Sequence, residues 1–210
     1  MRERLLRHFP ELSEAQLSQF ETMMRLYPEW NAKINVISRK DIDNLFVNHI
    51  LHSLVIASFL GRLEAGTTFM DLGTGGGFPG VPLAVMYPDC RFHLIDRIAK
   101  KLRVAEDIAR QAGLENITFQ HGDAGECHDR FDYVVSRAVM PLNELVRIAV
   151  RNVSAESPAG NRYQNGIIAL KGGDLAEELA LTGRRWDVYE ISHFFDEEFF
   201  ATKKVVHTAR

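Results

Sequence analysis

Hydrophobic residues near the start of the chain recur at helical spacing. One set follows a 3-4-3 pattern, which places its members on one face of a helix: Leu17, Phe20, Met24 and Tyr27. Ser13 and Gln16 predict a capping box at the start of this helix. Pro28 predicts a kink or an end, because proline lacks the amide hydrogen that a helix interior needs.

A second helix is predicted from about Asp41, with Ser38 as a possible cap. Its apolar side is formed by Ile42, Leu45, Phe46, His49 and Ile50. Residues 30–37, between the two helices, mix polar and apolar positions and are expected to form a loop. Residues 1–65 are therefore predicted to be a helical N-terminal extension.

From residue 67 onwards, short apolar runs alternate with helical segments. Five strands are predicted, at 67–72, 91–96, 116–121, 131–137 and 166–171, with helices at 98–112, 142–153 and 174–181. This alternation is typical of βαβ units and a mostly parallel sheet. Two last strands, 186–194 and 202–208, are only seven residues apart, too close for a crossover helix, so they should pair antiparallel. Residues 66–210 are thus expected to be one α/β domain with a seven-stranded sheet.

A glycine-rich turn, Asp71–Gly80, follows the first predicted strand and opens a helix. Gly75, Gly77 and Gly80, with Asp96 further on, fit the dinucleotide-binding fingerprint. The alternative spacing, Asp71-x-Gly73-x-Gly75-x-Gly77, resembles the first motif of S-adenosylmethionine-dependent methyltransferases. The terminal hairpin favours the methyltransferase fold, and a structural turn without a ligand is the third possibility.

In the methyltransferase interpretation, each acidic strand end has a role. Asp71 would face the cationic methionine end of S-adenosylmethionine, and Asp96 would accept hydrogen bonds from the ribose hydroxyls. After the third strand, Asp123 could accept from the adenine amine, and the backbone of Ala124 and Gly125 could line the ring. A plain surface turn at 121–126 is the alternative.

Composition and charge limit the classes of partner that the protein is expected to bind. The net charge is −3, so nucleic acid could contact only a local basic patch. Cys90 and Cys127 form no CxxC pair, and the eight histidines show no metal-ligand spacing, so we predict reduced thiols and no metal. The charged N-terminus and the interrupted apolar stretch 51–63 predict a soluble, cytoplasmic protein that does not enter a membrane. Nothing indicates an obligate oligomer, and a monomer is expected.

Missing motifs restrict the reaction. Neither Asn-Pro-Pro-Tyr nor Asp-Pro-Pro-Tyr, motifs associated with amine methylation, occurs, and neither cysteine follows a proline or threonine, as a pyrimidine C5 nucleophile typically does. No base is evident on the fourth strand. A methyl-acceptor atom that already has a lone pair, such as guanine N7, needs no general base.

Six segments carry a specific resemblance to a known family: Trp30–Asn31, Asn35–Ser38, His49–Ser53, Asp71–Leu83, Ser136–Ala138 and Ala169–Gly172. In order and spacing they resemble glucose-inhibited division protein B, the ribosomal small-subunit methyltransferase G family. The resemblance runs from about residue 20 to the end and implies a Rossmann-like class I methyltransferase fold. It departs at His52, where an aspartate is common, and in the length of segment 122–130.

The resemblance implies N7 methylation of one guanine in the 530 loop of 16S rRNA, at position 527, within the small ribosomal subunit. It implies a cofactor site at Gly73, Phe78, Ala124, Gly125 and Arg137. Arg137 and Lys171, at two strand ends, are the catalytic candidates.

Other polar residues are candidates for RNA contact: Asn31, Asn35, His49, Arg97, Lys100, Lys101, Arg103 and Lys171. The basic stretches 2–7 and 203–204 could join them, although each is more often a solvated face. Two other functions stay open at this point. One is methylation of a small molecule, and the other is a non-catalytic S-adenosylmethionine-binding role in ribosome assembly.

Overall fold

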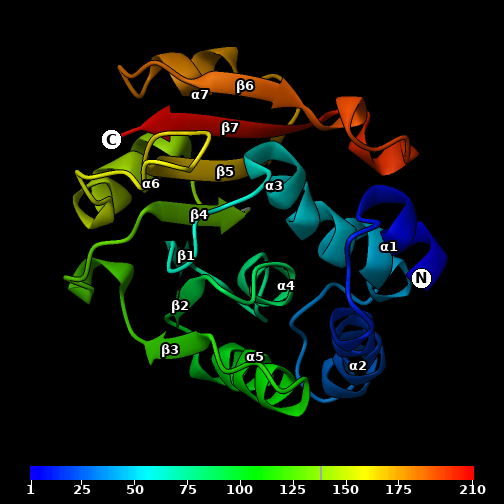
Figure 1. The fold of residues 1–210 in the computed structure, drawn as a ribbon. Coiled ribbons are helices and arrows are strands. Elements are labelled where there is room, and N and C mark those ends of the chain that lie inside the picture. Colours follow the sequence, from blue (N-terminus) through cyan, green and yellow to red (C-terminus); the bar gives the residue numbers. More distant parts are fainter. Residues whose placement is uncertain (138) are drawn as a thin grey trace.

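The strands form one seven-stranded sheet in the order β3-β2-β1-β4-β5-β7-β6, seen in Figure 1 from β3 at the bottom to β6 at the top. The computed structural model describes residues 1–137 and 139–210, so Ala138 of the Ser136–Ala138 motif lies outside the described residues. The strands are β1 (Thr68–Leu72), β2 (Arg91–Asp96), β3 (Ile117–His121), β4 (Tyr133–Arg137), β5 (Gly166–Gly172), β6 (Asp187–Glu190) and β7 (Lys203–Ala209).

The first five strands are parallel, whereas β7 runs antiparallel to both β5 and β6. The predicted mostly parallel sheet with a C-terminal antiparallel hairpin is therefore confirmed. The strand boundaries agree with the prediction within two residues, except that β6 ends at Glu190 instead of 194, because a 3-10 turn, η5 (Ile191–His193), places Ile191 fully in the core.

Helices cover both faces of the sheet. One face packs on α4 (Gly80–Met86), α5 (Ala99–Gln111) and the N-terminal helices, and the other on α6 (Leu142–Ala149) and neighbouring turns. Strand residues alternate between these two cores, as the two-residue period of a strand requires: Phe69 faces the first and Met70 the second. The remaining elements here are η3 (Ala124–Glu126), η4 (Val150–Asn152), α7 (Ala176–Ala180) and η6 (Glu198–Phe200).

The N-terminal extension consists of α1 (Arg2–His8), α2 (Glu14–Asn31), η1 (Ile42–Asn44), η2 (Leu45–Leu51) and α3 (His52–Leu60). The capping box of Ser13 and Gln16 is present, as predicted. The prediction for Pro28 is wrong, because α2 continues through it to Asn31. Pro28 lies less than one turn from the helix end, and the buried Leu26 and Tyr27 hold this part of α2 against the core.

Residues 42–60 form a continuous helical run, in which η2 is a π-helical segment. By length and composition this run could cross a membrane, but 61% of its most apolar part is buried inside the fold. Core helices of this kind pass the same test, so the run is weak support for a membrane span.

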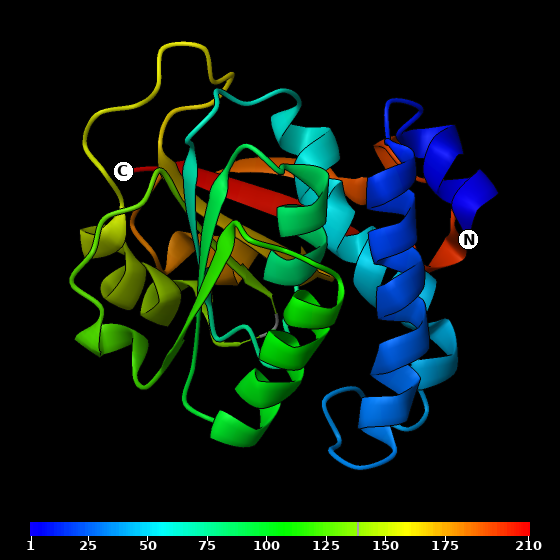
Figure 2. The same cartoon turned by 60° about the horizontal axis from the view of Figure 1, so that its bottom comes forward.

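The extension and the sheet share one hydrophobic core. Buried residues from Leu5 to Leu60 belong to the same cluster as those of β1, β2 and α4. Helices α2 and α5 lie side by side (Figures 1 and 2), and the Trp30 indole donates a hydrogen bond to Asp107 at 2.8 Å. The predicted division into a helical extension, 1–65, and an α/β domain, 66–210, falls in the turn before β1 and stays a prediction.

Candidate active site

The glycine-rich loop between β1 and α4 turns sharply as soon as the strand ends. Gly73, Gly75 and Gly77 have positive φ angles of 72°, 58° and 103°, which residues with a side chain rarely adopt. The amides of Gly73 and Thr74 donate to the Ile95 carbonyl at 2.9 and 3.1 Å. The loop is thereby anchored to the end of the neighbouring strand β2.

A pocket of about 700 Å³ opens beside this loop, at the carboxyl ends of the parallel strands. That is the edge at which open α/β sheets bind their ligands, and the volume is typical of a small-molecule site. The wall includes most of the predicted cofactor residues: Gly73, Gly75, Phe78, Asp96, Asp123, Ala124 and Arg137.

Asp96 shapes the wall opposite the loop. One of its carboxylate oxygens accepts a hydrogen bond from the Gly75 amide at 2.7 Å, and the other accepts from the Ile98 amide at 2.7 Å. Each carboxylate oxygen has a second lone pair. Asp96 can therefore hold the loop and still accept hydrogen bonds from the two hydroxyls of a ribose.

Asp123 caps the short turn η3 at the next strand end. It accepts from the Gly125 amide at 2.6 Å and pairs with Arg97, and these contacts lower the pKa of its carboxyl. The Gly125 carbonyl accepts from Arg151, so both backbone groups of Gly125 are already used. Gly125 lies outside the pocket wall, and the predicted adenine contact is better placed at Asp123 and Ala124.

Asp71 lies beneath the loop, not on the pocket wall. Its side chain is fully buried and accepts hydrogen bonds from the Thr74 hydroxyl at 2.6 Å and the Gly80 amide at 2.8 Å. Burial raises its pKa to about 7, against the opposing effect of those two bonds. Asp71 therefore holds the glycine loop in shape through one carboxylate oxygen, Oδ2. Its predicted place at the methionine end of the cofactor stays a prediction.

Gly77 also lies behind the wall, at a point where no side chain fits. A Cβ there would lie 2.6 Å from a Val81 methyl and 3.1 Å from the Tyr27 hydroxyl, with φ at +103°. We expect Gly77→Ala to lower the melting temperature by about 5–10 °C and to weaken binding of S-adenosylhomocysteine. Gly113→Ala is the matched control, because Gly113 has φ +70° but open space around it. Equal melting temperatures for the two variants, measured by calorimetry, would contradict this packing.

The N-terminal extension supports the loop from behind. The buried Tyr27 hydroxyl donates to the Gly76 carbonyl at 2.8 Å, and its ring stacks on Phe78 with 4.6 Å between ring centroids. Val36, from the loop after α2, lies over Gly76 and lines the pocket. The extension is thus a structural part of the site.

Arg137, at the end of β4, lies at the centre of the site. Its guanidinium donates to the Asn48 carbonyl at 3.1 Å and contacts the His49 Nδ1 at 3.0 Å. The guanidinium carbon is 5.0 Å from the centre of the Phe78 ring. Two of its five N–H groups are engaged in these hydrogen bonds, and no third bond is formed within residues 1–137 and 139–210. Because Arg137 also lines the pocket, its remaining donors are available to a ligand.

Lys171 is held away from the pocket wall. Its ammonium donates to the Met140 carbonyl at 3.0 Å and to Glu178, whose carboxylate also accepts from the Leu142 amide. These contacts fix the segment after β4, which contributes Met140 to the wall. The geometry supports Lys171 as a positioning residue and gives no support to a direct catalytic or RNA contact.

The N-terminal candidates differ in their surroundings. The Asn31 side chain accepts from the amides of Val36 and Ile37 and donates to the Ile37 carbonyl. Three hydrogen bonds hold it within its own loop, so the geometry gives no support to the predicted RNA contact, which stays a prediction. Asn35 is exposed on that loop. His49 lies between Asp41 and Arg137, behind the pocket wall.

The basic candidates on α5 lie near the pocket. Arg97, just before α5, and Lys101, on α5, contribute to the pocket wall. Lys100 and Arg103 are exposed on α5. The stretch at residues 2–7 is different, because Arg2, Arg4 and Arg7 form ion pairs with acidic residues of the same chain. The positive charges of residues 2–7 are therefore paired with carboxylates of the same protein.

Sequence reasoning missed several apolar wall residues: Val36, Ile98, Val139, Met140 and Ile148. Ile98 and Val139 are more than a third exposed, an unusual exposure for aliphatic side chains. Their positions, just after two strand-end residues already singled out, were the available signal. Val36 lies in the Asn35–Ser38 segment of the family resemblance, but its place in the pocket was not predicted, because its contact with Gly76 joins segments that are far apart in the sequence.

These residues fit S-adenosylmethionine. Gly75 has nothing within 4 Å of its Cβ position, so its backbone is open to close approach. Asp96 provides acceptors for hydroxyl groups, Ile98 and Met140 provide apolar surface for a flat ring, and Arg137 provides donors for a carboxylate. The wall thus offers matching groups for the nucleoside and for the amino-acid part of the cofactor.

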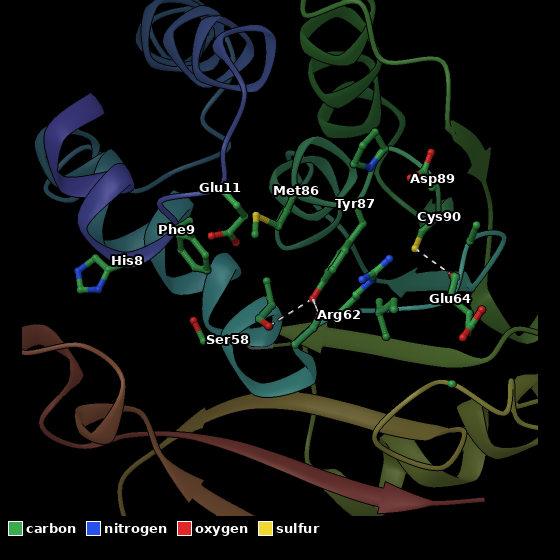
Figure 3. A pocket seen from close by; sticks show the side chains of 16 residues that line it. His8, Phe9, Glu11, Ser58, Arg62, Glu64, Met86, Tyr87, Asp89 and Cys90 are labelled. Carbon is green, nitrogen blue, oxygen red and sulfur yellow. Dashed lines mark hydrogen bonds between the residues drawn. The ribbon is translucent and has the colours of Figure 1, made fainter.

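A second hollow, of about 970 Å³, lies at the opposite, amino-terminal edge of the parallel strands (Figure 3). There the Tyr87 hydroxyl donates to the Ala57 and Gly61 carbonyls at 3.2 and 2.7 Å, which ties α4 to α3. Nearby, ligand atoms of His8, Asp196 and Glu197 lie within 4.8 Å of one another. Arg7 and Arg4 already pair with these two carboxylates, which accounts for the cluster without a metal.

The fold resembles solved structures of proteins that bind or depend on S-adenosylmethionine, at low sequence identity. A variant of MtNAS in complex with S-adenosylmethionine matches with a TM-score of 0.58 and 16% identity, over 94% of this chain and 77% of that one. An S-adenosylmethionine-dependent methyltransferase from Aquifex aeolicus matches with a TM-score of 0.54 and 16% identity, over 75% and 88%. These matches confirm the predicted class I methyltransferase fold.

Sequence relatives are closer. The ribosomal RNA small subunit methyltransferase G of Bacteroides fragilis is 52% identical, over 97% of both chains. The protein of the same name from Flavobacterium psychrophilum is 47% identical, over 98% of this chain and 96% of its own. The GidB family model, described as rRNA small subunit methyltransferase G, matches residues 16–205. The chain is therefore an S-adenosylmethionine-dependent methyltransferase that belongs to the rRNA small subunit methyltransferase G family.

Proposed function

We propose that this protein methylates N7 of a single guanine, at position 527 in the 530 loop of 16S rRNA. The observation that carries the proposal is the pocket itself. It joins a glycine loop and Asp96, which suit the cofactor, to Arg137, which has donors to spare. The names of the relatives support ribosomal RNA as the substrate.

Guanine N7 suits a site of this kind because its lone pair is available at neutral pH. When bound, S-adenosylmethionine would supply a methyl group on a positively charged sulfur: the bond from N7 to the methyl carbon would form as the carbon–sulfur bond breaks, which leaves a neutral thioether and puts the positive charge on the guanine. No proton has to move, so the residues of the pocket have to orient the base and exclude water. Orientation of this kind contributes about 7–11 kcal/mol to a rate enhancement.

Arg137 is the residue that we expect to contact the substrates. Its free N–H groups could bind the cofactor carboxylate or the guanine O6, both of which accept hydrogen bonds from arginine. The target base must be exposed or splayed out of the structured RNA for its N7 to reach the methyl group. The exposed aliphatic side chain of Val139, on the pocket wall, offers an apolar surface to such a base.

The test uses radiolabelled S-adenosylmethionine and small subunits from cells that lack this enzyme. We expect one labelled nucleoside, 7-methylguanosine, that maps to the 530 loop. A label on another atom or in another loop would overturn the proposal. If the protein binds the cofactor but labels neither subunits nor free RNA, the proposal is also wrong, and a small-molecule acceptor or an assembly role takes its place.

Binding to the RNA should depend strongly on salt. The basic residues of α5 lie beside the pocket in a chain of net charge −3, so contacts with phosphates are local. We expect Lys100→Ala to reduce the slope of log K against log salt by about one unit. Arg62→Ala is the control, because Arg62 is exposed at the other edge of the sheet. An equal slope in all three proteins, measured by filter binding between 50 and 200 mM salt, would exclude Lys100 from the interface.

A cytoplasmic location and a monomeric state stay predictions.

A further inference from the structure

Within residues 1–137 and 139–210, no carboxylate forms an ion pair or hydrogen bond with the guanidinium of Arg137. Its two hydrogen bonds go to the π-helical segment η2, where the Asn48 carbonyl is 3.1 Å away and the His49 Nδ1 is 3.0 Å away. Single π-helical turns inside helical runs are frequent at functional sites. This one connects the extension directly to the end of β4.

Behind His49 lies a third residue, Asp41. The His49 Nε2 is 2.6 Å from one carboxylate oxygen of Asp41, and the Asn48 side-chain amide donates to the other. An ionised carboxylate can only accept hydrogen bonds. The hydrogen of His49 must therefore be on Nε2, which leaves the lone pair of Nδ1 facing Arg137. Asp41 thus determines which tautomer Arg137 meets.

Four groups surround the His49 ring: Asp41 from the start of η1, Arg137 from β4, Phe78 from the glycine loop and His52 from α3. Burial and the charge of Arg137 lower the pKa of His49 to about 4. Burial raises the pKa of Asp41, but hydrogen bonds from Asn48 and His49 outweigh this and lower it overall. At neutral pH the ring is uncharged and the carboxyl is ionised, as the hydrogen-bond pattern requires.

We propose that Asp41 and His49 are positioning residues, which hold the guanidinium of Arg137 in register with the pocket by fixing the Nε2–H tautomer of His49. This inference rests on the proposed function, in which Arg137 contacts a substrate. It also changes the role predicted for His49, from a contact with RNA to a support behind Arg137. The Phe78 ring, 5.0 Å from the guanidinium carbon, supports Arg137 from another side.

The test compares Asp41→Ala, His49→Ala and a matched control, Asp43→Ala. Asp43 is exposed in the same short turn and forms no side-chain bond within the described part of the chain. In protein with 15N-labelled histidine and arginine, NMR reports the tautomer of His49 and the surroundings of the Arg137 guanidinium. The His49 signals are assigned by their loss in His49→Ala. We expect the Nε2–H tautomer in the wild type and in Asp43→Ala, and a tautomer mixture with a shifted Arg137 signal in Asp41→Ala.

Kinetics on small subunits provide the second readout. We expect Asp41→Ala and His49→Ala to lower kcat about ten- to a hundredfold, with the KM for subunits changed less than twofold. Asp41→Asn keeps one acceptor for Nε2, and the Asn48 side-chain amide can turn over to offer its oxygen to the new amino group, so this variant should recover most of the loss. A direct RNA contact by His49 would instead raise KM and leave Asp41→Ala close to the wild type, and that result would overturn the inference.

The NMR readout needs no substrate, so the two proposals can fail separately. If small subunits accept no methyl group, the proposed function is wrong, but the tautomer and the Arg137 signal still decide whether Asp41 and His49 hold Arg137. If the wild type shows the Nδ1–H tautomer, or if Asp41→Ala leaves both signals unchanged, the positioning role is wrong whatever the activity.

Discussion

Replacing Arg137 with alanine should abolish methyl transfer while the protein stays folded. The side chain lines the pocket with free N–H groups, and loss of a single oriented donor in such a site lowers a rate by about 10²–10³-fold. Since Arg137 has more than one donor to offer, we expect the loss to reach at least about a thousandfold. The fold tolerates the change because removing a buried charge offsets the two hydrogen bonds that are lost.

Two further variants separate charge from geometry. Arg137→Lys keeps the charge but cannot form the forked contact with Asn48 and His49, so we expect little recovery. Arg147→Ala, an exposed arginine on α6, is the control and should keep full activity. Transfer is measured with labelled cofactor on small subunits, and folding by the melting temperature. Wild-type turnover in Arg137→Ala would exclude this residue from the reaction.

The affinity for S-adenosylhomocysteine, measured by calorimetry, shows what Arg137 contacts. A weaker affinity in Arg137→Ala would indicate a bond to the cofactor carboxylate. An unchanged affinity with lost transfer would indicate a bond to the guanine or to the RNA. Either result is consistent with a donor that points into the pocket.

Most of the fold could be predicted from the sequence because its signals are local. Strands of five to seven residues, separated by helices, fix the parallel part of the sheet. The short connection before β7 fixes the antiparallel end. The continuation of α2 through Pro28 and the π-helical form of η2 could not be predicted. Both depend on packing between distant segments, since Tyr27 is held by Gly76 and His49 by Arg137.

The site was predictable to the extent that strand ends define it. Asp96, Asp123 and Arg137 each end or follow a parallel strand, and all three line one pocket. Asp71 and Lys171 also lie at strand ends, yet neither reaches the wall. Both bind partners inside the protein, such as Thr74 for Asp71 and Glu178 for Lys171, although Oδ1 of Asp71 has no hydrogen-bond partner within residues 1–137 and 139–210. A single sequence does not show such pairings, so a polar residue at a strand end is a candidate ligand only until its neighbours are known.

Asp96→Ala should have the largest effect on cofactor binding. Its carboxylate holds the Gly75 amide and the Ile98 amide, each at 2.7 Å, and has lone pairs left for the ribose hydroxyls. Hydrogen bonds to a charged group contribute about 1.5–3 kcal/mol each. Losing two of them weakens binding by at least about a hundredfold, and release of the Gly75 amide loosens the loop as well.

The measurement is the affinity for S-adenosylhomocysteine by calorimetry, with the melting temperature as a check on folding. Asp89→Ala is the control, because Asp89 is an exposed acid at the opposite edge of the sheet and should leave the affinity unchanged. Asp96→Asn is the sharper variant. An asparagine of the same shape has one acceptor oxygen, so its amino group must face either the Gly75 or the Ile98 amide, and donor meets donor. We therefore expect Asp96→Asn to bind as weakly as Asp96→Ala. Wild-type affinity in both would mean that the acidic strand end shapes the loop without touching the cofactor.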